Sequence, residues 1–303
     1  MWKSIVYLML FISVLIGGGN VSMPVANAEA QSAQAIEVTG IADVYGDGEK
    51  IAAAVLAYPQ AISAESVSTE DFAAEGKVIE AVYVSDKPVI PTVSKDGRYV
   101  ILKFAYQNTA YDGDLAQRKP RNEKQEERPQ GTDVPSRSDR KLPDLSLAVR
   151  QIGILRGVDG RDIAPMTESL SSTATLEPMI ESFEQYIFTD KETGLSMPYN
   201  LFLPQNYDPA KKYPLVFFVA DASTNINNVK TPLFQGNGAT VWATSEEQEK
   251  HECIVLAPQY TADMVESLGM MTTDANEWTP GLSLITNLLF DCIDRYSVDR
   301  NRI

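Results

Sequence analysis

Two short apolar runs without polar interruption, at residues 215–219 and 254–257, place the tightest limits on the fold. Such runs are typical of strands that are buried on both faces of a sheet. Residues 245–248 match a capping box that opens a short helix between the two runs. After the second run, Thr279 and Pro280 can begin another helix. This alternation of strand and helix predicts a parallel sheet with right-handed crossovers.

The chain before residue 166 has a different pattern, of short strands separated by turn signals such as Asp47-Gly48 and Asp96-Gly97. Segments rich in Val, Ile, Tyr and Leu predict strands at 36–39, 51–58, 77–84, 99–106 and 145–155. In one of them Val100, Leu102, Phe104 and Tyr106 alternate with other residues and therefore share a side. Short strands at this spacing predict an antiparallel β-sandwich over 36–166.

Two segments depart from these strand and helix patterns. Residues 112–144 carry equal numbers of acidic and basic side chains and several prolines, which predicts a disordered insertion between two strands. A partner-binding or protease-sensitive role for this insertion is the alternative. Residues 167–181 are rich in Thr, Ser and Glu and are predicted to be a linker. A partial second domain then covers 182–303 and opens with paired strands at 185–190 and 196–204.

The N-terminus has the order of a secretory signal: Lys3, an apolar run over 5–16, and the small residues Ala26-Asn27-Ala28. The run is shorter than the roughly 20 residues of a membrane-spanning helix. We expect residues 1–28 to be a signal peptide, with an uncleaved anchor as the alternative, and the mature protein to be secreted and soluble.

Charge and composition exclude several classes of function. The chain has 26 Lys and Arg against 41 Asp and Glu, so nucleic acid and anionic membranes are not expected as partners. His251 is the single histidine, which excludes a mechanism that needs two imidazoles within these residues. Cys253 and Cys292 are either a disulfide, which export would permit, or two buried small side chains. The sequence contains no phosphate-binding glycine motif, zinc motif or calcium loop, so we predict no cofactor and no metal.

Four ordered motifs carry a resemblance to a known family: residues 197–204, 212–218, 254–259 and 296–303. They resemble secreted α/β-hydrolases of the esterase and peptidase group near polyhydroxybutyrate depolymerases and prolyl oligopeptidases. The upstream sandwich resembles the immunoglobulin-like N-terminal domain of some bacterial esterases. The expected fold class is therefore an Ig-like β-sandwich followed by the N-terminal part of an α/β-hydrolase doubly wound sheet.

The resemblance implies a serine nucleophile in the motif G-x-S-x-G, followed along the chain by Asp and then His. This motif is absent from the 303 residues, and its expected place lies after Ile303. His251 precedes that place and is in the wrong order to be the base. We therefore expect no catalytic residue in this chain, which by itself would be an inactive N-terminal part of a longer protein.

The family also implies an oxyanion-hole donor after the first buried strand, where its members have His-Gly-x. The matching residues are Ala220, Asp221 and Ala222, and the backbone N–H of Ala222 would be the donor. An ionised Asp221 in the substrate pocket would oppose a developing negative charge. The resemblance implies that Trp278 forms a pocket wall, and 261–278 form a long loop that could act as a lid.

The expected function is hydrolysis of a carboxylic ester or a peptide bond in a small substrate through an acyl-enzyme. The alternative is a non-catalytic exported binding or adhesion protein with a degenerate hydrolase domain, suggested by Ala220-Asp221 in place of His-Gly. The Ig-like domain is expected to pack on the hydrolase domain or to mediate oligomerisation.

Overall fold

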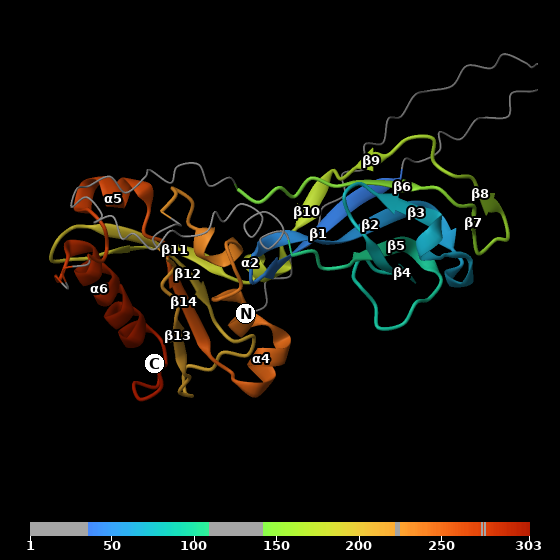
Figure 1. Ribbon diagram of the computed structural model, residues 1–303. Coiled ribbons are helices and arrows are strands. Elements are labelled where there is room, and N and C mark those ends of the chain that lie inside the picture. The colour runs from blue at the N-terminus through green and yellow to red at the C-terminus, as the bar shows by residue number, and fades with distance from the viewer. Residues whose placement is uncertain (1–35, 109–141, 222–224, 274, 276) are drawn as a thin grey trace, which may run out of the picture. The chain divides into compact units, whose positions relative to one another are not determined.

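The computed structural model describes residues 36–108, 142–221, 225–273, 275 and 277–303 (Figure 1). The predicted signal peptide and residues 112–141 of the predicted insertion lie outside the described residues. No helix within the described ranges is long and apolar enough to cross a membrane.

A five-stranded sheet, mostly antiparallel, builds the first half of the chain (Figure 1). Its order is β10 (Ala174–Leu176), β1 (Glu37–Tyr45), β2 (Gly48–Ile62), β5 (Gly97–Phe104) and β4 (Ile79–Ser85). A second sheet contains β3 (Phe72–Ala74), β6 (Ala148–Gln151) and β9 (Leu170–Ser171), and β7 (Leu155–Arg156) pairs with β8 (Asp162–Ile163). Two short 3-10 helices, η1 (Ala64–Ser66) and η2 (Thr69–Asp71), connect β2 to β3.

The core of this half confirms the predicted alternation for Val100, Leu102 and Phe104, whereas Tyr106 lies after the end of β5 and is 48% exposed. Val100, Leu102 and Phe104 are buried in one cluster with Leu56 and Val149, which come from β2 and β6. The opposite face of β5 contributes Ile101 to a smaller cluster with Ala53 and Val55. These clusters show the sheet packing expected of a sandwich.

The predicted linker over 167–181 needs correction. Leu170 and Ser171 form β9 against β6, and 174–176 form β10, which pairs in parallel with β1. The short helix α2 (Pro178–Glu181) follows and buries Ile180. Thr and Ser suit extended backbone, and Leu170 packs on the sandwich core, so this segment completes the sheets instead of spanning solvent.

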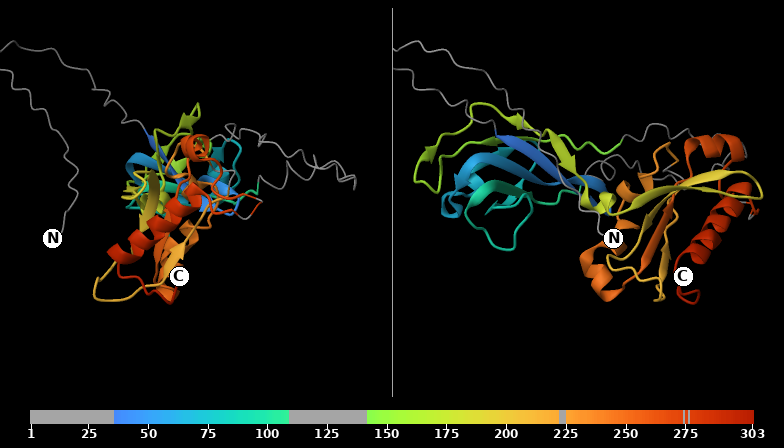
Figure 2. Two further views of the ribbon diagram at one scale, coloured as in Figure 1. Left: turned by 90° about the vertical axis from the view of Figure 1, so that its left-hand side faces the viewer. Right: turned by 180° about the vertical axis from the view of Figure 1, so that it is seen from behind.

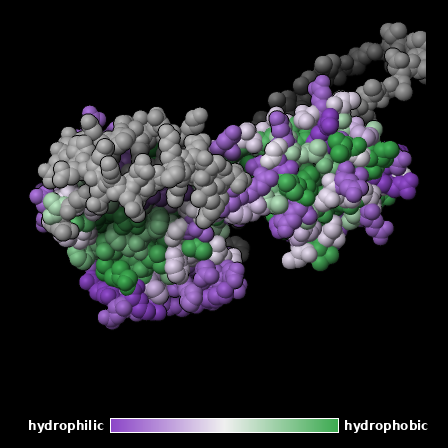
Figure 3. All heavy atoms as spheres, in the orientation of Figure 1, coloured by the Kyte–Doolittle hydropathy of each residue, from purple (hydrophilic) through white to green (hydrophobic). Residues whose placement is uncertain are grey.

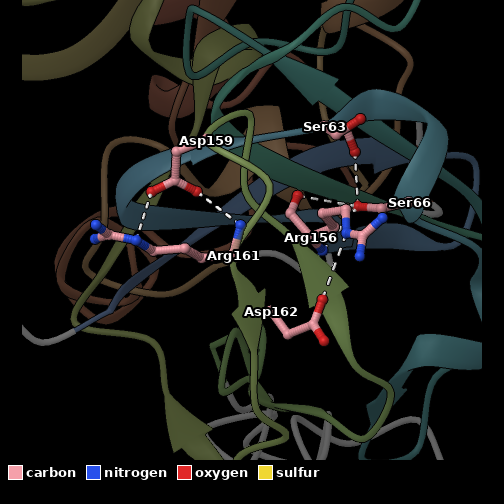
Figure 4. Close-up of polar contacts among 6 residues, drawn as sticks. All are labelled: Ser63, Ser66, Arg156, Asp159, Arg161 and Asp162. Atoms are coloured by element: carbon pink, nitrogen blue, oxygen red, sulfur yellow. Dashed lines mark hydrogen bonds and ion pairs between the residues drawn. The ribbon is translucent and has the colours of Figure 1, made fainter.

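Polar contacts hold the β7–β8 hairpin to the segment after β2 (Figure 4). The backbone N–H of Arg156 donates to Ser66 Oγ at 3.1 Å, and Ser66 Oγ donates to the Ser63 carbonyl at 2.8 Å. The ion pairs Arg156–Asp162 and Arg161–Asp159 flank this contact with largely exposed side chains. Exposed pairs of this kind contribute little stability, so the backbone contact fixes the hairpin.

The second half contains a four-stranded sheet in the order β11 (Glu184–Thr189), β12 (Ser196–Phe202), β14 (Ile254–Pro258) and β13 (Leu215–Phe217). The predicted hairpin is confirmed, because β11 and β12 pair in antiparallel and Gly194 in the turn has a φ of +71°. The run at 254–257 lies in β14 and is buried throughout, as predicted. Of the run at 215–219 only 215–217 form β13, in which Leu215 alone is buried, and Val219 is 41% exposed, so the prediction of a strand buried on both faces holds for β14 only. The two strands pair in parallel as predicted.

Both faces of β14 are covered, and helices lie on either side of the sheet (Figure 2). Ile254 and Leu256 of β14 pack in a cluster with α6 (Pro280–Arg295), whereas Val255 and Ala257 pack in a cluster with α3 (Thr231–Phe234) and η4 (Thr240–Ala243). Thr279 caps α6 as predicted by accepting from the Leu282 N–H at 3.0 Å. The cap of α4 (Ser245–Lys250) is Thr244, one residue earlier than the capping-box match.

The two cysteines are free and lie in clusters on opposite faces of the sheet: Cys253 on the α3 side and Cys292 on the α6 side. Burial raises the pKa of Cys253, and burial together with Asp291 raises the pKa of Cys292 to about 12. Of the two alternatives, the structure therefore shows buried small side chains that stay protonated at neutral pH.

Glu49 near the start of β2 makes stability depend on pH. Its side chain is buried, Oε1 has no hydrogen-bond partner within the described residues, and burial with nearby Glu177 raises its pKa from 4.5 to about 7. Since the folded state holds this proton more tightly, the contribution of Glu49 to stability is most favourable at low pH and declines as pH rises from about 4.5 to about 7. We expect Glu49→Gln to stabilise the protein by about 2 kcal/mol at pH 8 and to have little effect at pH 4.5.

Denaturant unfolding of both proteins at the two pH values measures this difference. Glu37→Gln on neighbouring β1 changes an exposed carboxylate and should stay within about 0.5 kcal/mol of the unmodified protein at both. An equal effect of Glu49→Gln at pH 4.5 and pH 8 would contradict the buried-carboxyl explanation.

Candidate functional site

A cavity of about 230 Å³ lies where β13 and β14 end. Ligands of open α/β sheets bind beyond the carboxyl ends of parallel strands, so this is the expected place for a site. Ten residues line the cavity: Val219, Ala220, Asp221, Asn225, Pro258, Tyr260, Met270, Met271, Thr272 and Ile285. They come from the loop after β13, the last residue of β14, the segments that follow β14 and helix α6.

The cavity has an apolar body with a few polar groups at its wall. Met270, Met271 and Ile285 offer aliphatic and thioether surface, and the methionines can adapt to ligands of different shape. The Tyr260 hydroxyl donates to the Gly269 carbonyl at 2.8 Å. Burial raises the pKa of Tyr260, so the phenol remains neutral at physiological pH. The arrangement suits a small uncharged ligand with one polar end.

The structure brings together only part of the site that the sequence predicts. Asp221 lines the cavity, as predicted for the substrate pocket, and Ala222 lies outside the described residues. Trp278 is 68% exposed and donates from Nε1 to Ser283 Oγ at 2.7 Å. It does not line the cavity, so its predicted role as a pocket wall gains no support. His251 follows α4 at the surface, also outside the lining.

The segment 261–278 contains more structure than the predicted long loop. Helix α5 (Ala262–Leu268) begins directly after Thr261, whose hydroxyl accepts from the Met264 N–H at 3.3 Å. The spacing of a capping Thr before Met264 was a signal that the sequence interpretation missed. Tyr260 and Asn225 were also missed, although Tyr260 directly follows the Ala-Pro-Gln motif.

Buried amides tie the loop after β13 to the sheet. Asn200 Nδ2 donates to the carbonyls of Val229 at 2.7 Å and Ala257 at 3.0 Å. Gln259 Nε2 donates to the Ile226 carbonyl at 2.8 Å. The residues that follow the cavity-lining Asn225 are therefore fixed to the sheet interior.

No group of three or more His, Cys, Asp or Glu side chains in the described part of the chain could hold a metal ion. The polar side chains that line the cavity are those of Asp221, Asn225, Tyr260 and Thr272.

Comparison with known proteins agrees with this architecture. Residues 37–164 match the family model of the esterase Ig-like N-terminal domain. A solved thermostable esterase is similar over 88% of this chain and 69% of its own, with 24% identity and a TM-score of 0.69. This likeness shows a shared fold, and together with the family match it fits an Ig-like domain followed by a hydrolase-like fold.

Two solved structures of a ferulic acid esterase from Anaeromyces mucronatus match over 39% of this chain and 44% of their own. Their identities are 19% with bound ferulic acid and 21% without substrate, at TM-scores of 0.24 and 0.26, which are too low to support an argument. A search of curated proteins gave no significant match.

Proposed function

We propose that these residues belong to an exported serine hydrolase that cleaves small carboxylic esters. The observation that carries the proposal is the cavity at the carboxyl ends of β13 and β14, in a chain whose fold is that of a thermostable esterase. The match of 37–164 to an esterase N-terminal domain supports an ester, rather than a peptide bond, as the target.

The nucleophile, acid and base are proposed to lie after Ile303. Residues near the chain's last position already run beside β13: Tyr213 pairs in parallel with Val298, and the Leu215 N–H donates to the Arg302 carbonyl at 3.0 Å. A strand continuing in this direction would lie parallel to β13 and reach the cavity with its carboxyl end. Figure 3 shows apolar surface over the side of the molecule that carries α6 and β13, which suits a further buried layer.

The loop after β13 is proposed to stabilise the oxyanion through the backbone N–H of Ala222. Backbone donors tolerate changes of side chain, so the replacement of His-Gly by Ala220-Asp221 need not remove this function. The Asp221 carboxylate in the cavity wall would repel anionic substrates and weaken oxyanion stabilisation. Uncharged esters are therefore the proposed substrates.

Export rests on the predicted signal peptide at 1–28. The Ig-like sandwich is proposed to pack on the complete hydrolase domain or to mediate oligomerisation.

The second candidate function is a non-catalytic exported binding protein, which the carboxylate of Asp221 in the cavity wall favours.

A fluorophosphonate probe on the full-length parent polypeptide separates these functions. Covalent labelling of one serine after residue 303, together with hydrolysis of 4-nitrophenyl butyrate, is the expected result. Residues 1–303 alone should neither label nor hydrolyse the ester. A parent that stays unlabelled would support the binding protein, and hydrolysis by residues 1–303 alone would refute the proposed position of the triad.

A further inference from the structure

Two fully buried amides lie in the sheet next to the cavity. Asn200 on β12 and Gln259 directly after β14 are both 0% exposed. A primary amide in an apolar interior is costly unless it is hydrogen-bonded, and an aliphatic side chain would fill the same space without that cost. Their partners therefore indicate what these amides do.

Both amides donate to the same short stretch of backbone. Asn200 bonds to the carbonyl of Val229 and Gln259 to the carbonyl of Ile226, at 2.7 and 2.8 Å. This stretch directly follows Asn225, which lines the cavity. The two bonds anchor that wall to β12 and to the end of β14.

A third contact links the stretch to the opposite wall. Asn227 Nδ2 donates to Asp263 Oδ1 at 2.7 Å, and the Asp263 N–H donates to Asn227 Oδ1 at 3.2 Å. Asp263 lies in the first turn of α5, and the chain after α5 provides Met270 and Met271 to the cavity. The loops that form both walls are thus joined through residues 226–229.

We propose that Asn200 and Gln259 are positioning residues, which hold residues 225–229 in place so that the cavity keeps its shape for an uncharged ester. They touch the loop backbone, not the cavity, so they act through Asn225. The inference deepens the proposed function and depends on it for the nature of the ligand. The anchoring itself is testable without catalysis.

Hydrogen exchange of residues 1–303 tests the anchoring. In Asn200→Leu and in Gln259→Leu, amides in peptides that cover 225–230 should exchange about tenfold faster, because each change removes a buried hydrogen bond. Peptides of α6 should exchange as before. Unchanged exchange at 225–230, or faster exchange throughout the sheet, would overturn the proposal.

Gln248→Leu is a matched control, because Gln248 Nε2 also bonds backbone carbonyls, those of Trp242 and Cys253, away from the cavity. It should accelerate exchange near those residues and leave 225–230 unchanged. If the leucine variants do not fold, Gln259→Met removes the same donor while keeping the length of the side chain, so it gives the same test. It too should accelerate exchange at 225–230, and no acceleration would overturn the proposal.

Binding of methyl benzoate, followed by ligand-observed NMR, tests the consequence for the site. The dissociation constant should rise about tenfold in Asn200→Leu and Gln259→Leu and remain unchanged in Gln248→Leu. Unchanged affinity in variants with loosened loops would overturn the positioning role. If the unmodified chain does not bind the ester but the local exchange effect is present, the anchoring is supported and the proposed ester function fails.

Discussion

Gly97→Ala should strongly reduce the free energy of unfolding of the sandwich. A β-carbon at Gly97 would lie 2.0 Å from the Ser85 carbonyl oxygen and 2.5 Å from the Asp86 backbone nitrogen. Both neighbours are backbone, so no rotamer change relieves the overlap, and β4 must move away from β5. We expect a loss of about 3 kcal/mol or more, measured by denaturant unfolding.

Gly46→Ala is the control for this substitution. Its β-carbon would meet its nearest neighbour, Asn237 Oδ1, at 3.8 Å, which is an ordinary contact. The change should stay within about 0.5 kcal/mol of the unmodified protein. A Gly97→Ala variant as stable as Gly46→Ala would show that β4 and β5 are not as close as described.

Gly281→Ala should lower both the stability of the protein and the affinity of the cavity for its ligand. In most helix interiors this change gains about 0.5–1 kcal/mol, because alanine is the better helix former. Here the new β-carbon would lie 2.5 Å from the Tyr260 hydroxyl oxygen and 2.9 Å from Cζ. Tyr260 is 7% exposed and bonded to Gly269, so it has little room to move. We expect a net loss of about 2 kcal/mol.

Tyr260 lines the cavity, so its displacement should also reduce the affinity for methyl benzoate about tenfold. A double-mutant cycle with Tyr260→Phe identifies the cause. Removing the hydroxyl relieves the shortest overlap, so the double variant should be more stable than the sum of the two single effects predicts. Additive losses, or a stabilising Gly281→Ala, would contradict the close packing of α6 on Tyr260.

The elements predicted most accurately are those whose structure follows from a few residues that are adjacent in the sequence. Ile254, Val255 and Leu256 are apolar without a break, so only a strand covered on both faces satisfies them, and β14 is such a strand. Thr279 followed by Pro280 likewise defines the beginning of α6 through one cap and one fixed φ.

Features that depend on distant partners were not predictable. The strands at 170–171 and 174–176 exist because β6 and β1 offer free edges, which short Thr- and Ser-rich segments do not reveal. The cavity likewise depends on the distance between two loops. Asp221 could be placed there from its position after β13, whereas Asn225 enters the wall only because Gln259 holds the residues after it.

The opposed packing of β14 has an evolutionary consequence. Ile254 and Leu256 belong to one layer, and Val255 and Ala257 to the other, so nearly every substitution in the strand disturbs a layer. The loops after β13 and β14 are connections, which generally tolerate more substitutions than the strands they join. Selection for a new ligand would therefore change the loops and spare the strand, and divergence among homologues should concentrate around 219–225 and 269–278.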